Sequence, residues 1–258
     1  MGSKIASSIL SDFADNAVLS ALYDVDAVKA KALAAVLKKK NIVASGIEDL
    51  IRKSSLVIEA AHPKYSSLIA RKAIQANRDC LIMSVGGLLD AGDVFALANR
   101  KKRAIYIPSG AICGIDGLKA HALAMVKKIT LTTRKPPAAL KSAPYIQQNH
   151  IDLDAIKGET VVFEGNVAQA ILAFPQNINV AATLALAARD KDKVNVRIVC
   201  SPVYTGNTHE IEIESAAGKT FIRCENEPSP DNPKTSYLAV LAAIAALRQI
   251  FDMVKIGT

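Results

Sequence analysis

The chain has 258 residues, half of them hydrophobic, and carries a formal net charge of +8 from 32 basic and 24 acidic residues. That length suits one large domain or two modest ones, and with six Tyr, six Phe and no Trp the core must consist mainly of Ala, Val, Ile and Leu. The basic residues are dispersed and lack interleaved aromatics, which argues against nucleic acid and favours small anionic ligands. Because the sequence shows neither a secretion signal nor an apolar run of membrane length, we expect a cytoplasmic protein without a membrane span.

The four cysteines, Cys80, Cys113, Cys200 and Cys224, lie far apart in the sequence. Their spacing matches neither a metal site nor a short disulfide framework. We therefore expect reduced thiols and no bound metal.

Strand and helix patterns alternate over the first 107 residues. Such alternation predicts a Rossmann-type, doubly wound parallel sheet with right-handed connections. Helix 26–38 should bury an apolar face formed by Val28, Ala32, Ala35 and Val36. The predicted strands are 17–23, 41–44, 56–61, 80–84 and 104–107, and the predicted helices are 1–10, 26–38, 47–51, one that starts at 63 and one that ends at 99.

The start of this predicted domain departs from the usual pattern. A dinucleotide-binding domain carries its glycine fingerprint between the first strand and the first helix, whereas here Met1 and Gly2 stand directly before that helix. Gly2 matches the last glycine, and the first strand with the earlier glycines is not in this sequence. We expect an N-terminally truncated sheet with a gap at its centre and an incomplete pyrophosphate cradle.

Asp24 follows the strand predicted at 17–23. An acid at that place commonly accepts hydrogen bonds from the ribose of a dinucleotide. The alternative is a helix N-cap, and the two roles are compatible.

A glycine-rich loop, Pro108–Gly117, follows the last parallel strand. Gly110, Gly114 and Gly117 permit positive φ angles and the close approach of a ligand or of another chain segment. The loop is therefore either a connector or a shelf for a ligand, and the sequence pattern changes after it.

The second half predicts an α+β domain in which one face of the sheet is uncovered. We place one domain at 1–113 and a second at 114–233, with the terminal segment 234–258 packing back on the first. The expected elements are a helix up to 125, strand 128–135, a polar loop at 136–157, helices 166–173 and 179–188, strands 194–200, 209–214 and 220–225, and helix 236–250.

The near-neutral pKa of an ordinary histidine suits proton transfer in both directions. Two of the four histidines stand where such a role is possible. His62 follows a strand at its carboxyl end, and His209 starts a strand among small and polar neighbours. His121 and His150 are better explained as structural or solvated. In the run 174–183, Asn177 and Asn179 stand at a helix start, where one amide can cap the helix and the other can hold a carboxamide such as that of nicotinamide.

Taken together, these residues resemble the L-aspartate dehydrogenase family. Five motifs occur in the family's order and at similar spacing over nearly the whole chain. They are Pro108-Ser109-Gly110-Ala111-Ile112 with Gly114 and Asp116, Leu131-Thr132-Thr133-Arg134-Lys135, the run from Phe174-Pro175 to Leu184, His209-Glu210-Ile211, and Asn232-Pro233-Lys234-Thr235-Ser236-Tyr237-Leu238-Ala239.

The resemblance implies oxidation of L-aspartate with NAD or NADP, through iminoaspartate, to oxaloacetate and ammonia, or a supply of iminoaspartate for NAD biosynthesis. It also implies a homodimer, with dinucleotide binding in the domain at 1–113 and with substrate binding, catalysis and dimerisation in the domain at 114–233. By position, Ala111 and Asn179 match the family's cofactor contacts and His209 matches its active-site histidine. Arg134 and Lys234 lie in matching motifs and are candidates for binding the substrate carboxylates, with surface charge as the alternative. In this context Asp24 would favour NAD over NADP.

Two other functions fit the same residues. The missing first strand would also suit a non-catalytic remnant that binds nucleotide or mediates oligomerisation. The enzyme class would hold with another acidic amino acid, or its imine, as the substrate.

Overall fold

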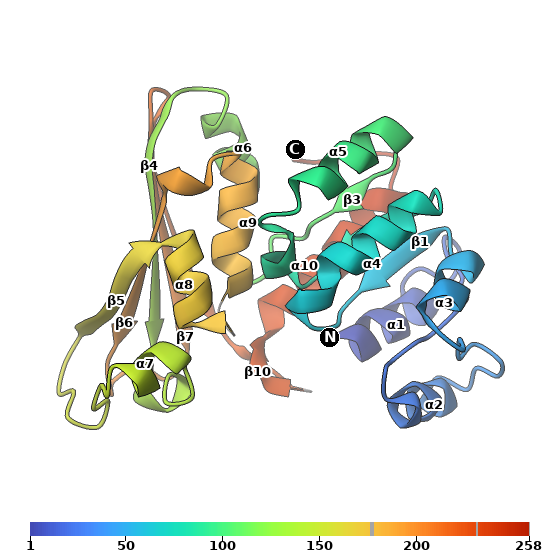
Figure 1. Ribbon diagram of the computed structural model, residues 1–258, viewed down its shortest axis with the longest axis horizontal. Coiled ribbons are helices and arrows are strands. Elements are labelled where there is room, and N and C mark those ends of the chain that lie inside the picture. The colour runs from blue at the N-terminus through green and yellow to red at the C-terminus, as the bar shows by residue number, and fades with distance from the viewer. Residues whose placement is uncertain (176–177, 231, 258) are drawn as a thin grey trace. The chain divides into compact units, whose positions relative to one another are not determined.

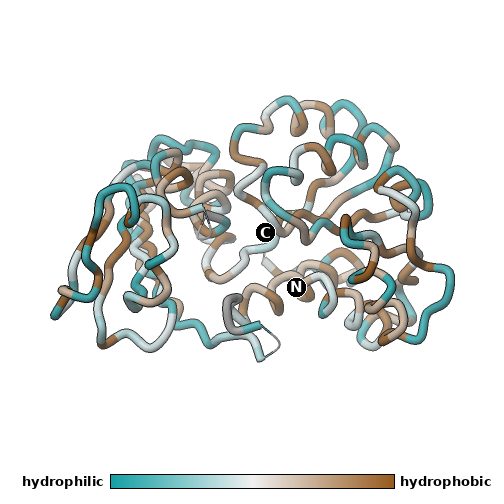
Figure 2. The backbone as a smooth tube through the Cα atoms, turned by 60° about the horizontal axis from the view of Figure 1, so that its bottom comes forward, coloured by the Kyte–Doolittle hydropathy of each residue, from teal (hydrophilic) through white to brown (hydrophobic). Residues whose placement is uncertain are grey.

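The computed structural model describes residues 1–175, 178–230 and 232–257, without the side chains of 178, 233 and 234. The chain forms two compact units, which we describe separately. The first comprises Met1–Pro108 and Ala243–Val254, and the second comprises Ser109–Ala242 and Lys255–Thr258. Figure 1 shows the elements of both, and Figure 2 shows hydrophobic residues along many of the helices and strands and hydrophilic residues in many of the connecting loops.

The first unit contains a parallel sheet of three strands in the order β1-β2-β3. Each strand reaches the next through a helical connection, as parallel pairing requires. The strands are β1 (Leu56–Glu59), β2 (Asp79–Ile82) and β3 (Ile105–Tyr106), and the helices are α1 (Gly2–Ser11), α2 (Ala27–Val36), α3 (Ile47–Lys53), α4 (Pro63–Gln75), α5 (Gly92–Lys101) and α10 (Tyr237–Phe251), the last belonging to this unit from Ala243 onward.

Helices pack on both faces of this sheet. On one face Leu81 and Met83 form a buried cluster with Ile5 and Ile9 of α1 and with Leu247 of α10. Because alternate strand residues point to opposite faces, Cys80 and Ile82 point the other way, where α4 contacts β2. The unit is thus the predicted Rossmann-type, doubly wound layer structure (Figure 1).

The predicted buried strand at 17–23 is wrong. Only Leu22 pairs there, through a single parallel bridge to Val43, and Val18 is 85% exposed. The backbone N–H of Leu22 donates to the carbonyl of Ile42, and its carbonyl accepts from the N–H of Ala44. In the described part of the chain this bridge lies outside the β1-β2-β3 ladder, so the parallel sheet is discontinuous.

The apolar face predicted for the second helix is also wrong. Val28 and Val36 are 74% and 77% exposed, whereas Ala30 and Ala34 are buried. The small alanines allow close packing of α2 along that side, and the valines on the other side stay in solvent.

A buried carboxylate ties the ends of β1 and β2 together. Glu59, 2% exposed, accepts hydrogen bonds from the backbone N–H of Ala61 at 2.7 Å and of Ser84 at 3.0 Å. The Ser84 hydroxyl donates to the carbonyl of Ala61 at 2.8 Å. The carboxyl edge of the sheet, where such folds bind ligands, is therefore held rigid.

The second unit contains a five-stranded mixed sheet in the order β5-β6-β4-β7-β8. Only β4 and β6 are parallel, and the other neighbours are antiparallel. The prediction that 136–157 is all loop is wrong, because a helix begins there at Pro144. Strand β5 was not predicted. The elements are β4 (Val126–Lys135), β5 (Thr160–Asn166), β6 (Val194–Cys200), β7 (Asn207–Ser215), β8 (Gly218–Asn226), the small antiparallel pair β9 (Pro228–Ser229) and β10 (Asn232–Ser236), α6 (Ile115–His121), α7 (Pro144–Gln148), α8 (Val167–Ala173) and α9 (Ile178–Ala188).

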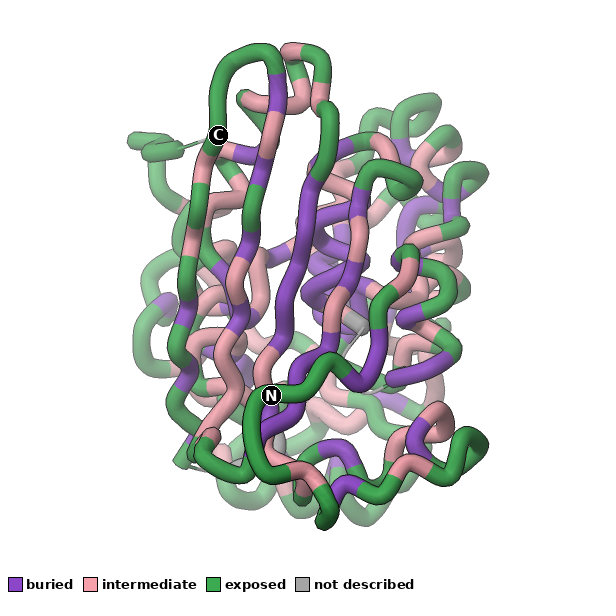
Figure 3. Tube along the Cα trace, turned by 90° about the vertical axis from the view of Figure 1, so that its left-hand side faces the viewer, coloured by how far each residue is buried: buried purple, intermediate pink, exposed green. Residues whose placement is uncertain are grey.

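The two faces of this sheet have different surroundings. Ile129, Leu131 and Ile211 are at most 1% exposed and lie on the face that packs against helices of this unit. The neighbouring positions point to the opposite face, where Phe221 is 59% exposed. Figure 3 looks onto that second face, with the strands in front of the helices. The sheet is thus the predicted open-faced one.

Candidate functional site

Three neighbouring strands hold His209 inside the second unit. His209 of β7 pairs with Thr133 of β4 on one side and with Cys224 of β8 on the other. Its position is in phase with Ile211, so its side chain points to the helix-covered face, and it is 6% exposed. The Thr133 hydroxyl lies 3.0 Å from Nδ1 in a hydrogen bond, which fixes the ring and leaves Nε2 for a reacting group.

The surroundings of His209 keep its imidazole neutral. Burial, and then the positive charge of Lys135, lowers the pKa of His209 from 6.5 to about 3. At neutral pH the ring can therefore donate or accept a hydrogen bond without carrying charge of its own.

A hollow of about 160 Å³ lies at the end of β7 from which His209 is two residues away. Asn207, two residues before His209 and on the same face, lines it together with its cross-strand partner Asn226. The other lining residues are four small apolar ones, three with hydroxyl groups and Glu227, so the hollow suits a small molecule that carries polar groups. They include Pro136, Gly206, Thr235 and Ser236.

The glycine-rich loop packs along β8. The carbonyl of Ala111 accepts a hydrogen bond from Nδ2 of Asn226 at 3.0 Å, and the Ser236 hydroxyl donates to Oδ1 of the same side chain at 2.9 Å. Gly114 has φ +74°, and a Cβ there would lie 2.2 Å from Cδ1 of Ile222. The loop is thus a positioned element, and its role as a shelf that places Ala111 against a cofactor stays a prediction.

Asn179 lies in the first turn of α9 and is half-buried. Its carbonyl accepts a hydrogen bond from the Thr183 hydroxyl at 2.8 Å, and α9 packs against β6 and α6. Asn177 lies outside the described residues. The role of Asn179 as a cofactor contact stays a prediction.

The first unit brings two of the candidates to one edge of its sheet. A Cβ on Gly2 would lie 3.5 Å from Cβ of Ala60, which follows β1, and His62 begins α4 two residues later. His62 is the N-cap of α4, and its Nδ1 accepts from the N–H of Lys64 at 3.3 Å. This capping bond accounts for His62 without a substrate.

Asp24 is exposed beyond the Leu22 bridge, as a ribose-binding acid would be. Its Oδ1 accepts from the N–H of Asp26 at 2.9 Å, which fixes the side chain in a local turn. The N-cap of α2 is Asp26, whose Oδ1 accepts from the N–H of Val28 at 3.0 Å. The alternative role of Asp24 as the N-cap is therefore wrong.

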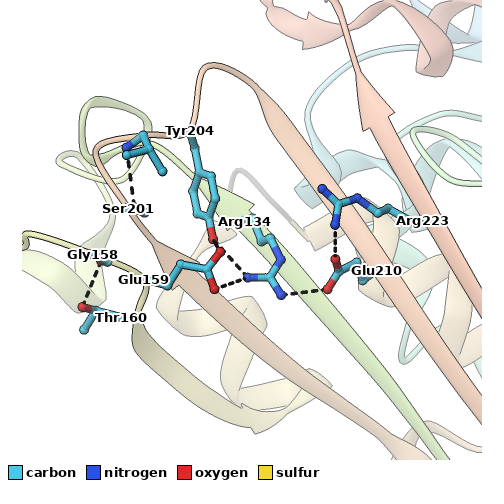
Figure 4. Close-up of polar contacts among 9 residues, drawn as sticks. Arg134, Gly158, Glu159, Thr160, Ser201, Tyr204, Glu210 and Arg223 are labelled. Atoms are coloured by element: carbon cyan, nitrogen blue, oxygen red, sulfur yellow. Dashed lines mark hydrogen bonds and ion pairs between the residues drawn. The ribbon is translucent and has the colours of Figure 1, made fainter.

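Arg134 follows Thr133 in β4 and therefore points to the open face of the sheet, opposite to His209. Figure 4 shows its polar contacts. Arg134 donates to Glu159 and Tyr204 at 3.0 Å each and to Glu210 at 2.9 Å. Glu210 also accepts from Arg223 at 3.0 Å. This ion-pair network does not support Arg134 as a ligand for a substrate bound beside His209. The backbone of Lys234 lies in β10, and its side chain is outside the described part of the chain.

Sequence reasoning missed Thr133, Lys135 and Asn226. Thr133 and Lys135 are 3% and 7% exposed and share the covered face with His209. A signal for them was present, because both are in phase with the apolar Ile129 and Leu131 of the same strand. Asn226 had no comparable signal, since its role depends on the loop that it binds.

Other classes of site find no support in the described residues. Among them, no group of three or more His, Cys, Asp and Glu side chains could hold a metal ion. Within the same residues, none of the helices has the length and apolar character needed to cross a membrane.

Comparisons with known proteins agree with this arrangement. Residues 1–108 match the family described as homoserine dehydrogenase, NAD binding domain, and residues 116–250 match aspartate dehydrogenase, C-terminal. The L-aspartate dehydrogenase of Methanosarcina barkeri is 44% identical over 94% of this chain and 91% of its own length, and that of Methanocaldococcus jannaschii is 40% identical over 100% and 96%. The crystal structure of aspartate dehydrogenase from Thermotoga maritima covers 80% of this chain and 79% of its own, with a TM-score of 0.67 and 30% identity. The chain therefore belongs to the aspartate dehydrogenase family.

Proposed function

We propose that this protein is an NAD(P)-dependent L-aspartate dehydrogenase. It oxidises L-aspartate through iminoaspartate, which is hydrolysed to oxaloacetate and ammonia or is passed to NAD biosynthesis. The observation that carries the proposal is the buried, neutral His209, which Thr133 holds two residues along β7 from Asn207, a lining residue of a small hollow. The chain that carries it is 44% identical to an L-aspartate dehydrogenase.

The first unit fits a dinucleotide. α1 begins at Gly2 beside the carboxyl edge of the sheet and has no acidic residue in its first turn. The backbone N–H groups at such a helix start are donors for phosphate oxygens, and the helix dipole favours negative charge there. We assign Gly2 to the pyrophosphate, Asp24 to the ribose, and Ala111 and Asn179 to the nicotinamide portion. The bound cofactor supplies the hydride acceptor.

Residues of the second unit donate, accept and position protons during the reaction. We assign to Nε2 of neutral His209 a hydrogen bond to the substrate nitrogen or to the water that attacks the imine carbon. Polar groups around the hollow, such as Asn207 and Thr235, are candidates for binding the two substrate carboxylates.

Initial rates with a panel of amino acids test the proposal. NADH formation should be measured with L-aspartate, D-aspartate, L-glutamate, L-asparagine and L-homoserine, each with NAD⁺ and NADP⁺. We expect the highest kcat/KM with L-aspartate. A preference for L-glutamate would identify another acidic substrate, and binding of NAD⁺ without turnover of any substrate would indicate a non-catalytic remnant.

Asp24→Ser should weaken the preference for NAD⁺ over NADP⁺ by about tenfold in kcat/KM, because the carboxylate both accepts ribose hydroxyls and repels a 2′-phosphate. Asp26→Ser is the matched control, since serine also caps a helix and this position should leave the preference unchanged. An unaltered ratio of the two kcat/KM values in Asp24→Ser would remove Asp24 from the cofactor site.

We also propose that the enzyme is a homodimer that uses the open face of the second unit's sheet. This face combines exposed apolar groups such as Phe221 with the charged groups of Arg134, Glu210 and Arg223. Light scattering on the purified protein should give twice the chain mass. A Phe221→Glu variant should shift the mass toward that of one chain, and an unshifted dimer would place the interface elsewhere.

A further inference from the structure

We propose that Lys135 takes the proton from the substrate ammonium group when L-aspartate is oxidised. The inference rests on the proposed function and assigns to its site a second proton-transfer residue beside His209.

The placement of Lys135 is set by strand β4. It lies two residues beyond Thr133, the residue that holds His209, so both side chains point to the same covered face. It is 7% exposed, which is rare for a lysine, and its charge acts directly on His209. The next residue, Pro136, lines the polar hollow. Strand β4 thus brings Lys135 to the end of the sheet where both His209 and the hollow lie.

The reaction needs a base at this place. Hydride can leave the α-carbon only when the nitrogen has a lone pair, so the ammonium group must first lose one proton. Neutral Lys135 accepts it and becomes an ammonium ion, and the substrate becomes a neutral amine. The α-hydrogen then leaves with the two electrons of its C–H bond as hydride to the nicotinamide, while the nitrogen lone pair forms the C=N bond of an iminium ion. Water adds to that carbon, and release of ammonium gives the ketone.

The strengths of the two candidate bases differ greatly. Burial lowers the pKa of Lys135 from 10.5 to about 8, close to the range of about 8 to 10 that is ordinary for aliphatic ammonium groups. His209, whose pKa burial and the charge of Lys135 lower to about 3, is a much weaker base for the same proton. Lys135 is therefore matched to this transfer, and His209 is suited to hydrogen bonding and to the water step.

Among the residues that the structure describes, few other titratable groups lie on the face that Lys135 shares, and Glu227 lines the neighbouring hollow. His209 lies on β7, Cys224 on β8 and Cys200, the partner of Lys135, on β6. Burial raises the pKa values of both thiols above their ordinary value. Helices α8 and α9 carry no titratable side chain, and His121 of α6 is bonded to Ser215 and Thr220, toward the other end of the sheet. We therefore expect Lys135 to give the pH–rate profile an inflection near pH 8.

The test compares Lys135→Met and Lys135→Arg with the wild-type enzyme, and Lys128→Met is the matched control at an exposed position of the same strand. The measurements are kcat and kcat/KM for L-aspartate from pH 5 to 10, binding of NADH, melting temperature, and rescue of Lys135→Ala by added methylamine. We expect the pH–rate profile of the wild type to have an inflection near pH 8. Lys135→Met and Lys135→Arg should each lower kcat by about 10²–10⁴-fold, should lack this inflection and should still bind NADH. Methylamine should restore part of the activity of Lys135→Ala.

Two outcomes would overturn the inference. If Lys135→Arg keeps the wild-type kcat and raises only KM, the residue binds a carboxylate instead. If the pH–rate profile of Lys135→Met keeps the inflection near pH 8, another group takes the proton. A wild-type protein that forms no NADH from aspartate would instead refute the proposed function, so the two failures are distinguishable.

Discussion

His209→Ala is expected to lower kcat for aspartate oxidation by about 10²–10⁴-fold, the usual contribution of a positioned proton-transfer group. The side chain is buried and fixed at Nδ1 by Thr133, so its removal leaves the reacting nitrogen and the attacking water without their partner. Binding of NADH, measured by calorimetry, should change little. Steady-state kinetics with L-aspartate measure the effect.

His121→Ala is the matched control for this experiment. His121 belongs to the same unit, and its two ring nitrogens each lie 2.8 Å from a hydroxyl group, those of Ser215 and Thr220. Its loss should cost stability and leave kcat within about twofold of the wild type, because it has no place in the proposed chemistry. A His209→Ala enzyme with a wild-type kcat would remove His209 from the reaction.

Gly87→Ala is expected to destabilise the first unit by at least about 1–3 kcal/mol, the usual cost of overpacking a tight interior. A Cβ at Gly87 would lie 1.9 Å from the carbonyl oxygen and 2.8 Å from the carbonyl carbon of Pro63, at the start of α4. These are backbone atoms, so α4 would have to move away from the 3-10 turn at Val85–Leu88. Urea denaturation, followed by circular dichroism, measures the free energy of unfolding.

Gly92→Ala is the control for that substitution. A Cβ at Gly92 meets no atom within 4 Å, and the residue begins α5, where alanine favours the helix. Its free energy of unfolding should stay within about 1 kcal/mol of the wild-type value. Equal stabilities of the two variants would show that α4 and the turn move apart at little cost.

Much of the fold follows from local patterns. The apolar strand at 56–61 and the following Pro63 predicted β1 and the start of α4, and the alternation after Lys128 predicted β4. Residues 17–23 were misassigned because apolar composition favours a strand, whereas a ladder also needs neighbouring strands on which to form. The predicted buried face of α2 was wrong for a similar reason. In an alanine-rich helix, the neighbouring elements against which the helix packs decide which side is buried.

The site was predictable in part. The motif around His209 predicted this residue as part of the site. The structure adds that the His209 side chain is buried and contacts Thr133. The choice of Arg134 over Lys135 overlooked the phase of β4, in which Ile129 and Leu131 already mark the inner face. The contact between Asn226 and Ala111 joins residues 115 positions apart and has no local signature.

The product balance of a single reaction tests the central claim most directly. Purified protein is incubated with L-aspartate and NAD⁺, and NADH, ammonium and oxaloacetate are each quantified. Oxidative deamination predicts equal amounts of the three products, formed only when both L-aspartate and the protein are present. Absence of NADH, or NADH without an equal amount of ammonium, would contradict the assignment of this chain as an L-aspartate dehydrogenase.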